Sequence, residues 1–333
     1  MHSDVEAPAA RAADRAPDGA LIRARGLVKR FGDFTAVDGI DVDVAPGEAF
    51  GFLGPNGAGK SSTMRMIGAV SPPTAGELRI LGMDPAVDGP AIRGRLGVVP
   101  QTDNLDLEIT VEENLLVYGR YFGLPKAVLR ARATELLDFV QLSDRARDKV
   151  EPLSGGMKRR LTIARALVNE PDVVLLDEPT TGLDPQARHV LWERLYRLKQ
   201  RGVTLVLTTH YMDEAEQLCD RLVVMDKGRI AAEGSPAELI RAWSTREVCE
   251  LRFPLAEDQP GPEHHLAQLQ ALVDRGAAAR IEPLADRLLL YADDGDAALS
   301  AVLAAGVRPL STLVRRSSLE DVFLRLTGRT LVD

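Results

Sequence analysis

Residues Gly54–Ser61 form a glycine-rich loop, GPNGAGKS, between an apolar segment and a helical one. The segment before the loop, Glu48–Leu53, is short and apolar, as expected of a buried strand. The segment after it, Lys60–Val70, has the pattern of a helix and is followed by Ser71-Pro72-Pro73. Glycines in such a loop let backbone N–H groups wrap a phosphate at a helix N-terminus, where the helix dipole favours anions. The order strand, loop and helix therefore predicts a phosphate-binding loop in an α/β fold.

Individual residues of this loop have predicted contacts with a nucleotide. Lys60 is expected to reach the β- and γ-phosphates, and the hydroxyl of Ser61 is placed to ligate Mg²⁺. A glycine-rich turn without a ligand is the structural alternative, but the strand before the loop and the helix after it argue against that interpretation. The residues expected here to bind ATP are Gly54, Pro55, Asn56, Gly57, Ala58, Gly59, Lys60, Ser61 and Ser62.

Two acidic residues follow another apolar segment farther along the chain. Asp177 comes directly after Val173–Leu176, so it is expected at the carboxyl end of a buried strand, where open α/β sheets bind ligands. A carboxylate at that place is suited to hold Mg²⁺ through water. Glu178 is the next residue and is expected on the side of the γ-phosphate. It is therefore the candidate general base for an attacking water molecule.

Composition restricts the classes of protein to which the chain can belong. The 333 residues are 45% apolar, which is enough for one large or two modest domains. The formal net charge of −8 argues against a broad nucleic-acid footprint and against electrostatic adhesion to anionic lipid. No apolar run approaches the roughly 18 residues that cross a bilayer, so any membrane role is expected to come through a partner. The two cysteines, Cys219 and Cys249, lie far apart, which disfavours a disulfide scaffold or zinc site and fits a reducing cytosol.

Up to about residue 240 the chain has the pattern of a single α/β domain. Leu21–Leu27 and Ile40–Val44 alternate like strands of an edge sheet. From about residue 103 to 170 the period becomes helical, which predicts a helical insert between two strands. Other apolar runs suit buried parallel strands at Gly97–Val99, Val173–Leu176, Val203–Leu207 and Leu222–Met225. We therefore interpret residues 21–240 as one domain and residues 1–20 as a disordered tail, with a short surface helix as the alternative.

After Ile240 the pattern changes to that of a small α+β domain over residues 246–328. Alternating segments predict strands at Val248–Phe253, Leu288–Tyr291 and Val307–Val314. Amphipathic segments predict helices at His264–Asp274, Asp296–Ala305 and Leu319–Leu326. No residue of this part suggests chemistry by its type and spacing.

The stretch Leu153-Ser154-Gly155-Gly156-Met157 lies shortly before the Asp177 strand, and with these motifs the region from about Leu21 to Ile240 resembles the ATP-binding cassette (ABC) superfamily. LSGGM is similar to the family's LSGGQ signature, which implies that Ser154, Gly155 and Gly156 bind the γ-phosphate of ATP held by an opposite subunit. These residues precede a helical pattern, so they can offer a hydroxyl and free N–H groups at a helix N-terminus. Met157 stands where the family usually has Gln, which removes one polar side chain but leaves the serine and the glycines.

Four further landmarks of the superfamily occur in order. The resemblance implies that Gln101 contacts Mg²⁺ or the attacking water, and that Asp184, in the stretch Thr181–Asp184, crosses a dimer interface. It further implies that His210 touches the γ-phosphate and that Phe31, in Lys-Arg-Phe-Gly, stacks on adenine. Without the resemblance, a histidine after a strand or a single aromatic residue is more often structural. The predicted site thus has three metal ligands, Ser61, Gln101 and Asp177, and three catalytic residues, Glu178, His210 and Gln101.

Longer phrases narrow the resemblance to exporters. PQTDNLD at 100–106, LSGGMKRRL at 153–161 and THYMDEA at 209–215 are similar to exporter ATPases of the daunorubicin-type drug-resistance and nodulation-factor groups. The ending SLEDVFL at 318–324 with LTGR at 326–329 resembles the nodulation-factor lipo-oligosaccharide exporters most. The resemblance implies a homodimeric ATPase, peripheral at the cytoplasmic face of the cell membrane, which pairs with a separate ABC-2-type permease. It implies export of a lipo-oligosaccharide, a drug or a similar amphipathic compound.

Several alternatives remain open on the sequence. Tyr118, Tyr121 and Phe122 cluster in the helical insert, where they fit the core of the insert and a groove for the permease about equally. For residues 246–328, a stabilising or dimer-supporting domain is favoured over a domain that senses cargo. An importer ATPase is a rival within transport. A soluble ABC ATPase acting on ribosomes or DNA is disfavoured, because the chain carries one cassette, lacks a long coiled coil and is acidic.

Overall fold

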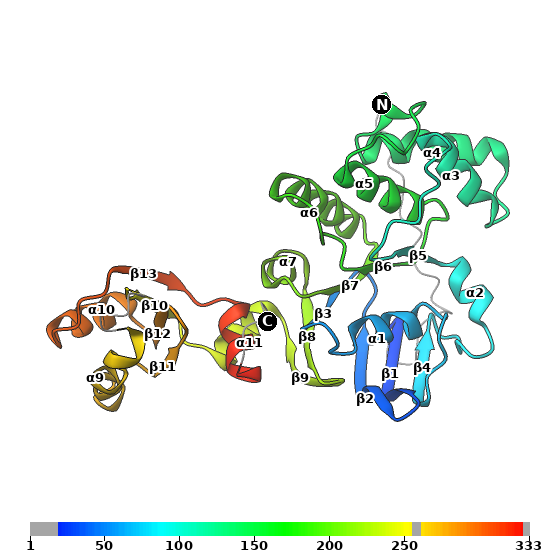
Figure 1. The fold of residues 1–333 in the computed structure, drawn as a ribbon. Coiled ribbons are helices and arrows are strands. Elements are labelled where there is room, and N and C mark those ends of the chain that lie inside the picture. The colour runs from blue at the N-terminus through cyan, green and yellow to red at the C-terminus, as the bar shows by residue number, and fades with distance from the viewer. Residues whose placement is uncertain (1–18, 255–260, 329–333) are drawn as a thin grey trace. The chain divides into compact units, whose positions relative to one another are not determined.

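The structure is a computed structural model that describes residues 19–254 and 261–328 (Figure 1). The chain divides into two compact units, Met1–Ser235 and Pro236–Asp333, and each is described by itself. All but two residues of the predicted tail 1–20 lie outside the described residues. The predicted first domain extends to residue 240, but the division comes five residues earlier, because helix α8 (Pro236–Trp243) packs against α11 (Leu319–Thr327) of the second unit.

A six-stranded sheet forms the centre of the first unit. Its strands, in spatial order, are β5 (Leu96–Val99), β6 (Val173–Asp177), β7 (Thr204–Thr209), β3 (Ala49–Leu53), β8 (Arg221–Asp226) and β9 (Arg229–Gly234). The first five run parallel, and β9 pairs antiparallel with β8. Every residue of β3 and β7 is buried, as expected for parallel strands covered on both faces. Because β3 and β6 flank β7, the chain leaves both strands at the same edge of the sheet, one strand apart.

A smaller antiparallel sheet covers the phosphate-loop side of the unit. It has the order β2-β1-β4, with β1 at Ile22–Phe31, β2 at Phe34–Val44 and β4 at Ala75–Ile80. Helix α1 (Lys60–Ile67) contacts β1 and β2 on one side and β6 and β7 on the other. Leu27, Val37 and Ile67 join Phe52 and Leu175 in one buried core. This packing holds the N-terminus of α1 against the ends of the central strands (Figure 1).

The predicted helical insert forms a layer with its own core. It contains α3 (Val111–Arg120), α4 (Lys126–Phe139), a short 3₁₀ turn η2 (Ser143–Arg145) and α5 (Gly155–Ala166). Leu115, Leu129 and Leu161, one from each main helix, lie in the shared core. Thr110 and Glu113 close a capping box at the start of α3, which satisfies free N–H groups there. Three other helices complete the unit: α2 (Gly89–Gly94), α6 (Pro185–Gln200) and α7 (Met212–Leu218).

The second unit is a four-stranded antiparallel sheet with helices on both faces. The sheet order is β11 (Arg280–Pro283), β12 (Arg287–Ala292), β10 (Glu247–Arg252) and β13 (Ser311–Arg316). Helices α9 (Pro262–Asp274) and α10 (Gly295–Ala304) cover one face through a core that includes Leu251, Leu290 and Val302. On the other face, Leu324 of α11 packs with Val248 and Tyr291. Successive side chains of β10 and β12 point to opposite faces of the sheet, so each strand contributes residues to both cores.

The predicted fold class is confirmed: a parallel core sheet, an antiparallel edge sheet and a helical insert, followed by a small α+β domain. Some predicted bounds were wrong. Helix α1 ends at Ile67 and not at Val70, because Ala69 has a left-handed φ of 51°. The strand predicted at Val307–Val314 begins at Ser311, since Val307 packs into the core directly after α10. Strands β4, β9 and β11 were not predicted. Within the described ranges, the helices are too short or too polar to span a membrane.

Candidate active site

The glycines of Gly54–Ser61 are required by the backbone path of the loop. Gly59, directly before α1, has a φ of +103°, and a Cβ there would lie 2.4 Å from the carbonyl oxygen of Ala36. A Cβ on Gly54 would lie 2.3 Å from the carbonyl oxygen of Met225. Backbone atoms cannot yield as a flexible side chain can, so neither glycine tolerates a side chain without movement of the fold. The loop is thereby fixed between β3, β8 and the edge sheet.

Lys60 begins α1 and is buried beneath this loop, with 4% of its surface exposed. Its ammonium group donates hydrogen bonds to the carbonyl oxygens of Gly54 at 2.7 Å and Pro55 at 3.0 Å. It also lies 3.8 Å from Oε1 of Glu178. Burial lowers the pKa of Lys60, and the charges of Glu178 and Asp177 oppose that shift. The lysine is thus a buried cation whose present partners are two loop carbonyls and one carboxylate.

A hydroxyl–carboxylate pair lies beside the loop, where a divalent cation is predicted. The hydroxyl of Ser61 donates to Oδ1 of Asp177 at 3.3 Å, and the hydroxyl of Thr208 donates to the same oxygen. Among the described residues no group of three or more His, Cys, Asp or Glu side chains could hold a metal ion by itself. One hydroxyl and one carboxylate fit Mg²⁺, which binds through few protein oxygens and completes its shell with water and phosphate.

Glu178 occupies the centre of the site and is 6% exposed. Its backbone adopts a left-handed φ of 46°, which is rare for a residue with a side chain and is maintained here by its surroundings. Its N–H donates to the carbonyl oxygen and the hydroxyl of Thr208, both at 3.1 Å. The adjacent ring of His210 holds the pKa of Glu178 below its ordinary value. Partial burial opposes this effect, and Lys60 and Thr181 support it.

Three more side chains face the Glu178 carboxylate. The amide of Gln101 donates to Oε2 at 3.0 Å, and the hydroxyl of Thr181 donates to the same oxygen at 3.2 Å. Nδ1 of His210 lies 3.3 Å from Oε1 as an electrostatic contact. The structure therefore brings together Lys60, Gln101, Glu178 and His210, which were predicted from four separate motifs. Thr181 was not predicted, although its place three residues after Glu178 was visible in the sequence.

A hollow of about 200 Å³ opens above the loop. Its lining comprises Phe34, Ala36, Gln101, Glu178 and the loop residues from Asn56 to Ser62. Phe31, the predicted adenine-stacking residue, is 52% exposed and pairs across the β1–β2 turn with Phe34. Phe34 lines the hollow, whereas Phe31 lies outside its lining. Phe34 is 62% exposed, so both aromatic side chains of this turn are accessible, and the adenine-stacking role of Phe31 stays a prediction.

Comparison with known proteins places these motifs in a family. A family model described as ABC transporter matches residues 37–181, and one described as the C-terminal domain of the nodulation factor export protein NodI matches residues 265–328. Nod factor export ATP-binding protein I of Ralstonia nicotianae is 48% identical, over 94% of this chain and 95% of its own length. The chain belongs to the ABC transporter ATP-binding protein family. Proteins of the same name from Paraburkholderia xenovorans and Cupriavidus metallidurans are 49% and 46% identical, over 92% and 94% of this chain and 96% and 99% of theirs.

Solved structures agree with this membership. An ATP-binding subunit of an ABC transporter superposes with a TM-score of 0.61 at 32% identity, over 67% of this chain and 92% of its own. A dimeric ATP-binding cassette in a post-hydrolysis state, bound to ADP and phosphate, gives a TM-score of 0.59 at 28% identity, over 64% and 98% of the two chains. This ABC protein is therefore an ATPase that binds ATP, and its class works as a dimer with a transmembrane permease.

The signature residues of this ABC ATPase lie apart from the Lys60 hollow. Ser154 caps α5, where its hydroxyl accepts a 3.3 Å hydrogen bond from the N–H of Met157. Asp184 caps α6 in the same manner. Ser154, Gly156 and Asp184 line a second hollow of about 220 Å³, which shares no lining residue with the first. Ser154, Gly155 and Asp184 are exposed. The structure thus groups the predicted residues into two sets within one chain.

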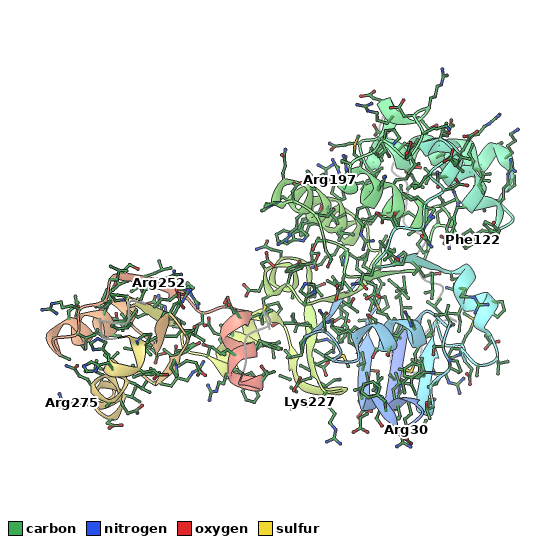
Figure 2. All side chains as sticks on the ribbon, viewed as in Figure 1. Arg30, Phe122, Arg197, Lys227, Arg252 and Arg275 are labelled. Atoms are coloured by element: carbon green, nitrogen blue, oxygen red, sulfur yellow. The ribbon has the colours of Figure 1, made fainter. Side chains whose placement is uncertain are left out.

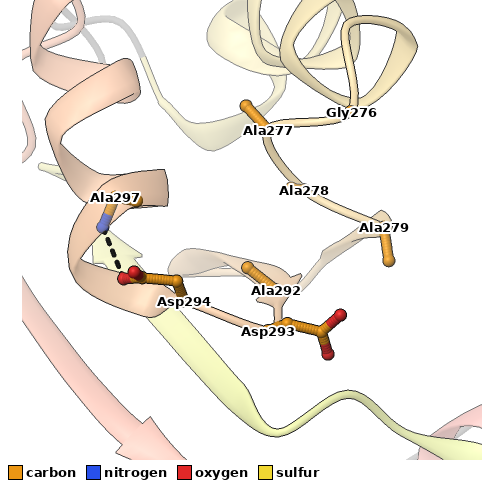
Figure 3. Close-up of a pocket in the computed structure, with 8 residues that line it drawn as sticks. All are labelled: Gly276, Ala277, Ala278, Ala279, Ala292, Asp293, Asp294 and Ala297. Atoms are coloured by element: carbon orange, nitrogen blue, oxygen red, sulfur yellow. Dashed lines mark hydrogen bonds between the residues drawn. The ribbon is translucent and has the colours of Figure 1, made fainter.

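A third hollow, in the C-terminal unit, shows no comparable chemistry. It measures about 430 Å³, and its lining is mostly alanine, with Gly276, Asp293 and Asp294 (Figure 3). The carboxylate of Asp294 accepts a hydrogen bond from the N–H of Ala297 and so caps α10. Asp293 is exposed to solvent. These contacts account for the acidic side chains of this hollow by helix capping and solvation.

Proposed function

We propose that this chain is the ATP-hydrolysing subunit of an ABC-2-type export complex that moves a lipo-oligosaccharide, a drug or a similar amphipathic compound through a separate permease. The observation that carries the ATPase part is the convergence of Lys60, Gln101 and His210 on the Glu178 carboxylate. The export part is supported by relatives named Nod factor export ATP-binding protein I, which match both units of the chain. Among these cargoes, lipo-oligosaccharide is supported by that name.

The residues around Glu178 divide the work of hydrolysis. Loop N–H groups and Lys60 bind the β- and γ-phosphates, and ATP replaces the carbonyl partners that Lys60 has in this structure. Ser61 and Asp177, with Gln101 beside them, hold Mg²⁺, which neutralises charge on the phosphate oxygens when bound. Glu178 is ionised, so it accepts a proton from water while the water oxygen attacks the γ-phosphorus and ADP leaves. Gln101 and His210 orient the water and the γ-phosphate.

Two copies are needed to complete each site. Ser154 and Gly155 are exposed at the N-terminus of α5 and lie outside the hollow that Lys60 lines. In a head-to-tail homodimer, the Ser154 hydroxyl and nearby N–H groups of one copy face the γ-phosphate held by Lys60 of the other. Asp184 lies beside Ser154 and belongs to the same interface. Closure of the dimer on ATP moves the permease, and hydrolysis reopens it.

The permease places the ATPase at the cytoplasmic face of the cell membrane as a peripheral subunit. Tyr121, which is 82% exposed, supports the docking role of the aromatic cluster in the helical layer. Its neighbour Phe122 lies at the outer edge of that layer (Figure 2). The acidic net charge of −8 gives no support to nucleic-acid binding.

The test is reconstitution of the ATPase with the permease that co-purifies with it. Inside-out vesicles are supplied with ATP and either an acylated oligosaccharide or daunorubicin, and uptake is measured together with phosphate release. We expect ATP-dependent uptake of the acylated oligosaccharide and stimulated hydrolysis. ATP-dependent loss of preloaded cargo from the same vesicles would mean import and would contradict the proposal. Vesicles with Glu178→Gln provide the inactive control.

A further inference from the structure

Arg159 in helix α5 is buried, at 4% exposure, and binds two separate segments of the active site. Its Nε donates to the carbonyl oxygen of Pro179 at 2.7 Å, and its Nη2 donates to those of Asp177 at 3.1 Å and Glu178 at 3.2 Å. Its Nη1 donates to the carbonyl oxygen of Pro100, the residue before Gln101. One guanidinium therefore holds the backbone at both Glu178 and Gln101, whose side chains hydrogen-bond to each other.

The same face of α5 binds the chain that follows Gln101. Residues 159, 162 and 165 are three positions apart and so lie on one side of the helix. The hydroxyl of Thr162 donates to Oδ1 of Asp103 at 3.0 Å, and Arg159 lies 3.4 Å from the same oxygen. Arg165 donates to the backbone and side-chain oxygens of Asn104. The sequence phrase PQTDNLD is thus bound by Arg159 of LSGGMKRRL and by the two residues Thr162 and Arg165 that follow this phrase in α5.

The position of Arg159 on α5 connects these contacts to Ser154, which is proposed to bind the ATP held by a second copy of the chain. Ser154 caps the helix, and Arg159 follows five residues later, about 7.5 Å along the axis at 1.5 Å per residue. An α-helix is stiff over that length, so a displacement of Ser154 moves Arg159 with it. The carbonyls of Pro100 and Glu178 follow through their hydrogen bonds.

We propose that Arg159 is a positioning residue that links the Ser154 end of α5 to the Gln101–Glu178 pair, so that engagement of Ser154 by the ATP of a second copy aligns the hydrolytic side chains. The inference rests on the proposed role of Glu178 as general base. Arginine suits this position because its planar fork supplies several donors in fixed directions. Lysine keeps the charge but lacks the fork, and glutamine supplies only two donors.

Removal of Arg159 should change the rate of hydrolysis more than the binding of ATP. Arg159→Gln in the full-length chain is expected to lower kcat at least tenfold, because misplacement of catalytic groups by about 1 Å costs up to about a hundredfold. KM for ATP and the dissociation constant of a fluorescent ATP analogue should change less than about threefold, because Lys60 and the loop remain. A purely structural role would lower the folded fraction and with it the apparent kcat at unchanged KM, so kcat is expressed per ATP-binding site, counted by titration with the fluorescent analogue; a structural role then leaves kcat per site at the parental value.

Arg165→Gln is the matched control. Arg165 lies on the same face of α5 and is 7% exposed, but its contacts are with Asn104 and the ring of Tyr118. We expect its kcat within about threefold of the parent value. Circular dichroism and thermal unfolding compare the folded fraction of both variants. If Arg159→Gln does not fold, Arg159→Lys replaces it, with the same expected loss in kcat because the fork is absent.

Double variants separate this proposal from the role of Glu178. If Arg159 acts through Gln101, then Arg159→Gln combined with Gln101→Ala should lose about as much kcat as the worse single variant. Multiplicative losses would overturn the proposal, as would a folded Arg159→Gln or Arg159→Lys variant with parental kcat. Glu178→Gln is measured in parallel. Parental hydrolysis in that variant would remove Glu178 as base, whereas an inactive Glu178→Gln beside a fully active Arg159→Gln would overturn the Arg159 proposal alone.

Discussion

The side-chain amide of Gln101 donates a 3.0 Å hydrogen bond to Oε2 of Glu178. Thr181 donates to the same oxygen, while Lys60 and His210 face Oε1. Among the described residues, Oε2 thus accepts two hydrogen bonds, whereas the contacts of Oε1 with Lys60 and His210 are electrostatic. The Gln101 hydrogen bond therefore fixes one oxygen of the carboxylate and leaves the other to accept a proton from water.

Glu178→Gln should bind ATP normally and hydrolyse it at least about a hundredfold more slowly, the usual contribution of a positioned general base. The substitution keeps the size of the side chain and removes its proton-accepting charge. Filter binding of labelled ATP and steady-state phosphate release measure the two quantities, and size-exclusion chromatography with ATP should show a trapped dimer. Glu193→Gln, an exposed change on α6, is the control. Near-normal phosphate release by the variant would exclude Glu178 as the base.

Two inactive variants should restore activity when they are mixed. In a head-to-tail dimer of one Lys60→Ala chain and one Ser154→Ala chain, one site lacks both residues and the other retains both. Each variant alone has only defective sites. Co-expression with two different affinity tags and tandem purification yields the mixed dimer, which should have up to about half the parental kcat if its two sites act independently. A mixed dimer as inactive as its parents would contradict a shared site.

Tyr121→Ser should reduce association with the permease and leave ATP hydrolysis by the isolated chain unchanged. Tyr121 is 82% exposed, and its ring lies 6.4 Å from that of Tyr118, so little of the fold depends on it. We expect at least a tenfold loss of co-purified permease, the size of a contact at the centre of an interface. Tyr196→Ser, a change of an exposed tyrosine on α6, is the control. Equal recovery of permease with both variants would exclude Tyr121 from the docking surface.

Asp321→Asn should destabilise the C-terminal unit by about 3 kcal/mol or more, because it breaks a buried ion pair from one side. Asp321 is 1% exposed and accepts hydrogen bonds from Arg315 at 2.7 and 3.0 Å and from the hydroxyl of Tyr291 at 2.9 Å. Tyr291→Phe removes only the neutral hydrogen bond and should cost roughly 1 kcal/mol. Urea unfolding followed by Trp243 fluorescence, with Trp192 replaced by Phe, reports on this unit. Equal losses in the two variants would show that the ion pair contributes nothing beyond an ordinary hydrogen bond.

The stability conferred by Asp321 should depend on pH. Burial tends to raise the pKa of Asp321, but Arg315 and the N–H of Ser318 prevail and hold it below its ordinary value of 3.8. A carboxyl whose pKa is depressed on folding stabilises the fold above its unfolded pKa, and the effect is lost as pH falls through the folded pKa. The free energy of unfolding of the parent should exceed that of Asp321→Asn by a constant amount from about pH 7 to about pH 5. This difference should shrink as the pH falls below the pKa of Asp321 in the unfolded chain. A difference that grows as pH falls would reverse the assigned sign.

The motifs predicted the centre of the fold well, because the residues that carry their chemistry directly follow the strands that position them. A buried strand, the glycine-rich loop Gly54–Ser61 and a helix follow one another directly, so the loop must lie at the end of the strand. Asp177 ends a buried strand of the same sheet and was placed at that edge for the same reason. Strands β4 and β9 were missed for a physical reason. Their exposed residues give no apolar period, and pairing with β1 and β8 defines them. Their tertiary neighbours, and not their own side chains, decide their structure.

The hydrogen bonds that hold the backbone of the site could not be predicted from the sequence for a related reason. Thr208 and Arg159 act through backbone atoms of Glu178, which lies 30 and 19 residues away from them in the chain. Nothing in their spacing shows which carbonyl a buried arginine reaches. The choice between Phe31 and Phe34 likewise depends on how the β1–β2 turn is oriented above the loop.

The hydroxyl of Thr208 has one further consequence. It accepts from the N–H of Glu178 and donates to the carboxylate of Asp177, so a single atom sets the spacing between the cation-binding oxygen and the backbone of the proton acceptor. The carboxylate of Asp177 and the backbone of Glu178 cannot move independently while that hydroxyl remains. Serine at position 208 can keep both hydrogen bonds, whereas valine, of nearly the same shape, loses both at once. Cation affinity and turnover are therefore expected to change together whenever this one position changes.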